Sequence, residues 1–366
     1  MTEKAKKKVN LSITNPKVFE AVKMVISILI ALALTLVILC LISDNPMQAI
    51  KTILTGPLTK KRYIIAVIER TVPYACAGLA AGLIFKTGAF NLGYEGIFTI
   101  SGVAVSAVAI NAVTTSGILH PALCLLAGAA CGGILMIIPA FLRAKFGTNE
   151  MVVTLMLNSV YSGISLFIVR TYMLSMTTST IGTPDYLPTA KFGYLSENLQ
   201  LTPTFIILLV ITVLLYLVTT KTKFGYQMRV AGTNPKFADY SGINSFKLAI
   251  VTAVIAGVLC GIGAGCHLLT QTAYFQPDKS LVGIGFSGTL LAMLGRNNPI
   301  GIVVAAFFIQ YLEQGTQILY FLDKAVPSEI VAIIEGVVIL LISSQYFLRG
   351  YREKKLLKEG LKDNAR

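Results

Sequence analysis

Runs of about 20 apolar residues recur along the whole chain, and they constrain its fold more than any other feature. A helix of that length crosses the hydrocarbon core of a bilayer, where backbone groups cannot be left unpaired. Of the 366 residues, 55% are hydrophobic and 13% are charged. Soluble domains carry about 25% charged residues. We therefore expect an all-α protein, a polytopic transmembrane helical bundle.

The apolar runs predict about ten spans. A transmembrane domain then covers residues 21–348, between basic cytoplasmic tails at 1–20 and 349–366. Residues 46–54 form a candidate interfacial helix between the first two spans. The expected spans are residues 21–42, 64–85, 90–112, 119–142, 150–169, 201–220, 248–270, 281–294, 300–321 and 329–348.

The distribution of the basic residues predicts the orientation. Ten spans place both termini on one side, and most of the 31 lysine and arginine residues then fall on that side. Because basic residues are retained in the cytoplasm, both termini are expected there. Nine basic residues fall outside or at the outer ends of spans, and the cluster at 60–62 opposes the rule locally. The net charge of +14 is spread over tails and short loops rather than a soluble domain, which argues against nucleic-acid binding.

A polar loop at residues 221–247 separates the two halves of the apolar sequence. It carries five basic residues and one acid, which places it in the cytoplasm. A loop of this length folds and has a role, because a simple turn needs only a few residues. Residues 234–240 predict a short helix, with Asn234 as N-cap, Pro235 in the first position and Gly242 as the stop. Such a helix offers a handle to a soluble partner.

The stretch at 90–96 carries the strongest signal inside the membrane. Glycines allow a helix to break there, and a carboxyl group in a span needs a partner or a wet cavity. In one interpretation Asn91 and Glu95 hydrogen-bond a solute, while Tyr94 and Phe98 offer aromatic faces. In the other, the segment is a structural re-entrant one whose Glu95 binds backbone amides.

Asn158 lies in the middle of an expected span. Its position predicts either an interhelical hydrogen bond or a contact with the solute. Glu150, eight residues earlier on about the same helical face, is expected to complement a helix N-terminus.

A weak internal repeat relates the two halves. Residues 78–82 resemble residues 261–265, and each stretch leads after a break to a glycine-interrupted apolar run. The copies are five spans apart, an odd number, so they are inverted in the membrane. Inverted repeats with broken helices are typical of transporters, and they place the pathway at the repeat interface.

Some motifs are absent from the sequence. The chain has no GxxxxGK[ST] phosphate-binding loop, no catalytic cluster, and no metal-ligand spacing among its six cysteines and two histidines. We therefore expect a transport protein rather than an enzyme, with no cofactor bound by this chain. Energy for active transport would come from another subunit.

Four motifs, spread over residues 63–348, resemble one family. FNLGYEG at 90–96 looks like the FNxGxEG motif of ABC importer permeases for branched-chain amino acids, ribose and nucleosides. TNEMVVTLMLN at 148–158 is similar to the (V/T)NEVxxTxMLN motif of the purine nucleoside and simple-sugar branch. Residues 232–244 look like the cytoplasmic coupling loop, and residues 285–299 resemble the late GFxGIAVALLGRxxP pattern. Tyr94 departs from the pattern, because small residues are commoner there.

The resemblance implies a permease subunit in the bacterial cell membrane. It would pair with a second permease, couple to a cytoplasmic ATP-binding subunit that holds the ATP, and receive solute from an extracytoplasmic binding lipoprotein. Nucleosides are the expected solute. Simple sugars, or a secondary transporter that works without ATP, are the alternatives. The implied pathway residues are Asn91, Tyr94, Glu95, Phe98, Asn158, Phe286 and Ser287, and the implied coupling residues are Gly232, Asn234, Pro235, Ala238, Tyr240 and Gly242.

Overall fold

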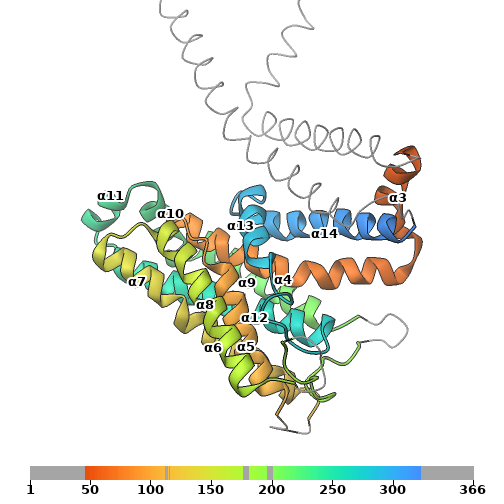
Figure 1. Ribbon diagram of the computed structural model, residues 1–366. Coiled ribbons are helices and arrows are strands. Elements are labelled where there is room, and N and C mark those ends of the chain that lie inside the picture. The colour runs from red at the N-terminus through yellow and green to blue at the C-terminus, as the bar shows by residue number, and fades with distance from the viewer. Residues whose placement is uncertain (1–45, 112–113, 115, 176–180, 196–200, 323–366) are drawn as a thin grey trace, which may run out of the picture. The chain divides into compact units, whose positions relative to one another are not determined.

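A computed structural model of the protein describes residues 46–111, 114, 116–175, 181–195 and 201–322 (Figure 1). The expected first and tenth spans and both basic tails lie outside these residues. The regular elements of the described chain are all helices, as expected. They are α3 (Pro46–Thr59), α4 (Lys61–Lys86), α5 (Tyr94–Ala109), α6 (Leu119–Leu135), α7 (Ile137–Phe146), α8 (Glu150–Tyr172), α9 (Thr204–Lys221), α10 (Lys223–Thr233), α11 (Pro235–Tyr240), α12 (Ser245–Gln271), α13 (Ile284–Leu294) and α14 (Pro299–Leu322).

Six described stretches are long and apolar enough to cross a membrane: α4, α6 with α7, α8, α9, α12 and α14. Helices α5 and α13 are shorter, at 16 and 11 residues. At 1.5 Å per residue they extend about 24 Å and about 17 Å, less than the roughly 30 Å hydrocarbon core. The runs expected at 90–112 and 281–294 are therefore broken spans with non-helical leads. The total of about ten spans is not confirmed.

Two compact units divide the chain, and each is described by itself. In the described part of the smaller unit, α3 packs on the C-terminal part of α14. A Cβ atom added to Gly315 would collide with the Ile53 carbonyl group, and one added to Gly56 would lie 3.5 Å from Ile318. The segment predicted as an interfacial helix at 46–54 is helical, and the helix α3 continues to Thr59.

The larger unit, residues 60–311, is built around α12, which contacts α4, α5 and α6 (Figure 1). Helices α6 and α12 approach through glycines. A Cβ at Gly257 would overlap the Gly132 carbonyl oxygen, and one at Gly261 would overlap that of Gly128. Because lipid tails are as apolar as side chains, helices in a membrane associate by this kind of close packing. The pairing also shows that the two helices run antiparallel.

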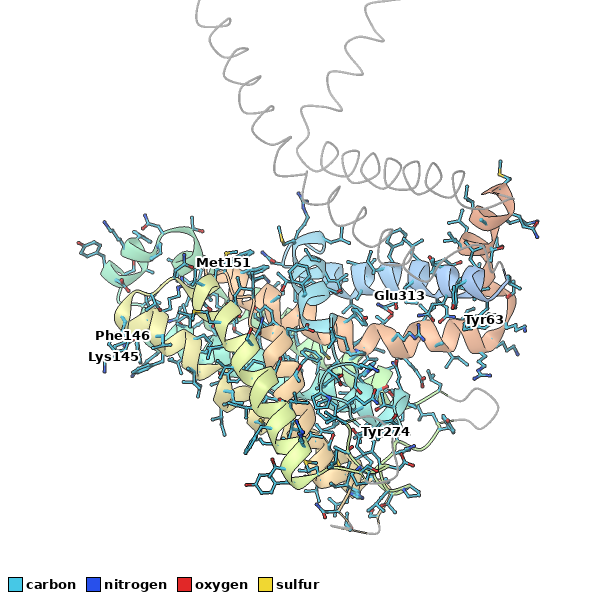
Figure 2. The ribbon with its side chains drawn as sticks, viewed as in Figure 1. Tyr63, Lys145, Phe146, Met151, Tyr274 and Glu313 are labelled. Carbon is cyan, nitrogen blue, oxygen red and sulfur yellow. The ribbon has the colours of Figure 1, made fainter. Side chains whose placement is uncertain are left out.

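The turn between α7 and α8 lies at the same end of the bundle as α10 and α11 (Figure 1). Gly147 ends α7 in the left-handed conformation (φ 66°). Figure 2 shows Lys145 and Phe146 beside this turn, with the Lys145 Nζ atom 5.7 Å from the centre of the Phe146 ring. The Asn149 side chain then caps α8 by accepting hydrogen bonds from the backbone N–H groups of its first turn.

The loop between α8 and α9, which the sequence places outside, packs on the lead into α13. Thr183 N–H donates to the Phe275 carbonyl group at 3.0 Å, and Phe275 N–H donates to Thr183 Oγ1 at 3.0 Å. The buried Tyr186 hydroxyl lies 2.8 Å from the Ser106 hydroxyl of α5. Burial raises the pKa of the Tyr186 hydroxyl.

Candidate functional site

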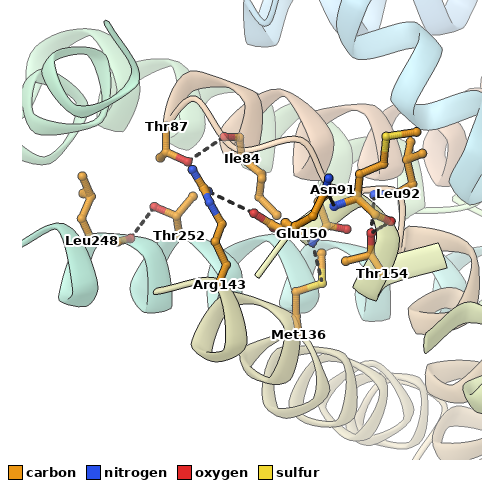
Figure 3. Close-up of polar contacts among 12 residues, drawn as sticks. Ile84, Thr87, Asn91, Leu92, Met136, Arg143, Glu150, Thr154, Leu248 and Thr252 are labelled. Carbon is orange, nitrogen blue, oxygen red and sulfur yellow. Dashed lines mark hydrogen bonds and ion pairs between the residues drawn. The ribbon is translucent and has the colours of Figure 1, made fainter. Parts of the chain in front are cut away.

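Asn91 stabilises the non-helical segment that precedes α5. Its Oδ1 atom accepts a hydrogen bond from Gly93 N–H at 2.7 Å, which folds the chain into a tight turn just before the helix. Its Nδ2 atom donates to Glu150 Oε1 of α8 at 3.0 Å (Figure 3). Asn91 is 1% exposed, so both contacts are shielded from water.

One face of α8 supplies the hydrogen bonds that the broken backbone lacks. Thr154 Oγ1 accepts from Leu92 N–H at 3.1 Å (Figure 3). Asn158 Nδ2 donates to the Leu92 carbonyl oxygen at 2.8 Å, and Asn158 Oδ1 accepts from Gly96 N–H at 2.9 Å. Residues four apart share a helix face, which is why Glu150, Thr154 and Asn158 act together. Backbone groups at membrane depth need such partners.

Glu150 is also paired with Arg143. The Arg143 Nη1 atom donates to Glu150 Oε2 at 3.0 Å, and the Glu150 side chain is only 6% exposed (Figure 3). The sequence predicts Glu150 at the start of a helix, and it does begin α8. Its bonds to Asn91 and Arg143 were missed, as was the role of Thr154. The TNEMVVTLMLN motif at 148–158 indicates this helix, but no local sequence pattern predicts that Asn91 contacts Glu150.

The second broken helix, α13, begins at the carboxylate of Glu95. Gly283 is in the left-handed conformation (φ 87°), and α13 has no side-chain cap from its own segment. Glu95 instead accepts hydrogen bonds from Gly283 N–H (2.5 Å), Gly285 N–H (2.9 Å) and Phe286 N–H (3.2 Å). The N-termini of α5 and α13 therefore meet. This geometry matches the structural alternative for Glu95, and its contact with a solute stays a prediction.

The predicted pathway residues divide into two groups. Tyr94 and Phe98 are fully buried, and Ser287 is 8% exposed. The Phe98 ring faces Gly263 of α12, where an added Cβ would lie 2.9 Å from it. Phe286 is 55% exposed, and Glu95 and Asn158 are partly exposed. The structure brings Glu95 and Phe286 together, whereas Asn158 reaches the same region through Gly96.

The predicted coupling helix is present as α11. Asn234 Oδ1 accepts from Phe237 N–H at 3.1 Å, and Pro235 occupies the first position of the helix. Gly242 has a φ of 77°, and Ile243 N–H donates to the Ala238 carbonyl group at 3.0 Å, which closes the C-terminus. Ala238 is buried, whereas Tyr240 is 91% exposed. The helix thus presents its last residue outward; its contact with an ATPase stays a prediction.

Gly232 fixes the coupling loop to the lead into α5. A Cβ at Gly232 would overlap the Lys86 carbonyl oxygen at the end of α4. Gly88 has a φ of 72°, and a Cβ there would lie 3.1 Å from the Gly232 carbonyl oxygen. The backbone before α11 therefore touches the segment that continues to Asn91.

The fold and this site define a helical membrane permease with two helices broken inside the bundle. A family model described as "Branched-chain amino acid transport system / permease component" matches residues 63–343. The chain belongs to this family.

Curated relatives match along most of the chain. The guanosine ABC transporter permease protein NupP of Bacillus subtilis is 27% identical, over 92% of this chain and 96% of its own length. The nucleoside ABC transporter permease protein NupB of Lactococcus lactis is 26% identical, over 91% and 93%. A glucose ABC transporter permease protein of Haloferax volcanii is 28% identical, over 90% and 88%. No solved structure matches the chain.

Proposed function

We propose that this chain is the membrane-spanning permease subunit of an ATP-driven importer of nucleosides. The observation that carries this proposal is similarity along almost the whole chain to the two nucleoside permeases NupP and NupB. The similarity to a glucose permease supports simple sugars as the second candidate solute. An ATP-independent secondary transporter is the remaining alternative.

The importer contains further subunits in this proposal. The sequence carries no phosphate-binding loop, so a cytoplasmic ATPase hydrolyses ATP and grips α11, where the exposed Tyr240 supports a contact. A second permease, the same or a paralogue, lies across the pathway from the face with Glu95 and Phe286. Support comes from the cost of a carboxylate at membrane depth, which has to face protein or water rather than lipid. An extracytoplasmic lipoprotein delivers the solute.

The transport cycle starts at the ATPase. Closure of the ATPase moves α11, and the contact of Gly232 with Gly88 passes the movement to the lead into α5. Helix α5 then shifts against α13 at the junction of their N-termini. Access alternates around this junction, as expected for broken helices at a repeat interface. The close Gly232 backbone contacts support this route, because packed backbone cannot absorb a displacement.

Uptake by reconstituted vesicles tests the proposal. The chain is co-reconstituted with its ATPase, second permease and binding protein, and labelled guanosine, adenosine and ribose are added with and without internal ATP. Nucleoside uptake that requires both ATP and this chain supports the proposal; vesicles without this chain are the control. Uptake of ribose without uptake of guanosine or adenosine would show that the solute is a simple sugar rather than a nucleoside. Uptake by this chain alone, abolished by an ionophore, would overturn the importer assignment.

A further inference from the structure

We propose that Glu95 determines specificity by excluding anionic solutes: its carboxylate occupies the anion-binding end of α13, so the pathway admits neutral solutes and rejects phosphorylated ones. This inference rests on the proposed function and names a property of the same site. It concerns nucleosides against nucleotides, and equally sugars against sugar phosphates.

The first step is the nature of the α13 N-terminus. The first N–H groups of a helix have no partner within the helix and carry a partial positive charge, so they bind anions. In broken-helix transporters such an end can receive an anionic group of the solute. Here Gly283, Gly285 and Phe286 direct their N–H groups at Glu95, at 2.5, 2.9 and 3.2 Å. A carboxylate of the chain itself therefore fills the position of an anionic solute group.

The second step is the charge that remains. Three N–H dipoles satisfy the carboxylate by hydrogen bonding, but they do not cancel its full negative charge. Within the described residues Glu95 forms no ion pair with a lysine or arginine. A phosphate that approaches this junction thus meets a negative charge, and the N–H groups of Gly283, Gly285 and Phe286 are already bonded to Glu95. The charge repulsion and the lack of these donors both disfavour phosphate binding at this junction.

The third step is access. Glu95 is partly exposed, and Phe286, which shares its hydrogen-bonded turn, is 55% exposed. A carboxylate has about four acceptor positions on its two oxygens, and three are used here. About one position remains for a donor on the solute, such as a ribose hydroxyl or a base N–H group. A neutral solute with donors is therefore the class that this site accepts.

The test compares anion binding by variants of the complete transporter in lipid nanodiscs. The probes are labelled orthophosphate and guanosine 5′-monophosphate, with labelled guanosine measured in parallel. Glu95→Ala removes the charge and frees three N–H groups. Glu69→Ala is the matched control, because Glu69 also accepts a backbone hydrogen bond from another segment, Thr202 N–H at 3.1 Å. The ATPase adds the same background in every variant.

Glu95→Ala is expected to raise the affinity for both anions by about tenfold or more over the wild type, while Glu69→Ala raises neither. Glu95→Gln keeps an oxygen at the N–H groups but removes the charge, and a gain of several-fold is expected; it decides the question if the alanine variant does not assemble. Unchanged anion binding in assembled Glu95 variants, or an equal gain in Glu69→Ala, would overturn the proposal. Absence of guanosine binding by the wild type would contradict the nucleoside function, while the anion comparison would still decide the role of Glu95.

Discussion

Asn91 and Glu150 are 59 positions apart in the sequence, and their side chains meet at 3.0 Å inside the bundle. Through this bond α8 holds the turn that precedes α5. The same carboxylate binds Arg143, so one buried acid joins the end of α7, the start of α8 and the broken lead into α5. The geometry of the α5 N-terminus, where Glu95 begins its contacts with α13, depends on this network.

Loss of the Glu150 carboxylate should destabilise the fold. Glu150→Ala leaves the Arg143 guanidinium and the Asn91 amide without their partner, at a cost of about 2–3 kcal/mol. Glu150→Gln keeps an oxygen for Asn91 and should lose less. The measurement is the free energy of unfolding in mixed micelles titrated with SDS. Equal losses in the two variants would contradict the assigned bond to Asn91.

Asn158→Leu should impair both stability and uptake. It removes two hydrogen bonds and leaves the Leu92 carbonyl and the Gly96 N–H unpaired at membrane depth. Hydrogen bonds in membranes average about 0.6 kcal/mol and reach about 1.7, so a total loss of about 1–3 kcal/mol is expected. Ser159→Ala, at the exposed neighbouring position, is the control and should be close to neutral. Wild-type stability with lost uptake would instead favour a direct contact of Asn158 with the solute.

A methyl group at Gly257 should separate α6 from α12. The added Cβ would overlap the Gly132 carbonyl oxygen, and overpacking of this kind costs about 1–3 kcal/mol. Gly163→Ala in α8 is the matched control, because nothing lies within 4 Å of its Cβ position. Alanine is the better helix former, so that variant should be neutral or more stable by up to about 1 kcal/mol. Equal thermal midpoints for the two variants would contradict the glycine packing.

Tyr240→Ala should uncouple ATP hydrolysis from uptake without affecting the fold. Tyr240 is 91% exposed, so its loss should change stability by no more than about 0.5 kcal/mol. Loss of a central aromatic contact to the ATPase would reduce ATP-driven uptake by about tenfold or more. Tyr172→Ala, also exposed but at the far end of α8, is the control. Full ATP-driven uptake by the Tyr240→Ala variant would contradict the prediction that Tyr240 of α11 contacts the ATPase.

The sequence predicted most helices well, because apolar length determines where a chain crosses a membrane. It also predicted the short helix after Asn234, since capping chemistry is local. It could not decide whether Glu95 faces a solute or backbone N–H groups, since that depends on Gly283 and its neighbours, nearly 190 positions away. The two interpretations of Asn158 were equally open for the same reason. Its hydrogen bonds join α8 to the break before α5, which no local pattern can indicate.

The lengths of the broken helices were also harder to predict than their existence. The glycines at 90–96 and the glycine-interrupted run of the second repeat indicated the breaks, but the apolar residues around them continue into the non-helical leads. Hydropathy records where a segment lies, and it does not distinguish a helix from an irregular backbone that is buried in protein. Phe275 and Leu281 are both fully buried, although neither is in a helix.

The glycine contacts between α6 and α12 limit how the bundle can deform. Two helices whose backbones touch at Gly132 and Gly257, and again at Gly128 and Gly261, cannot slide along one another without collision. Helices α6 and α12 therefore move together as a rigid body. The conformational change that alternates access has to occur at hinges outside this helix pair. Residues 272–283, the non-helical lead into α13, are one segment of the larger unit that can provide such a hinge.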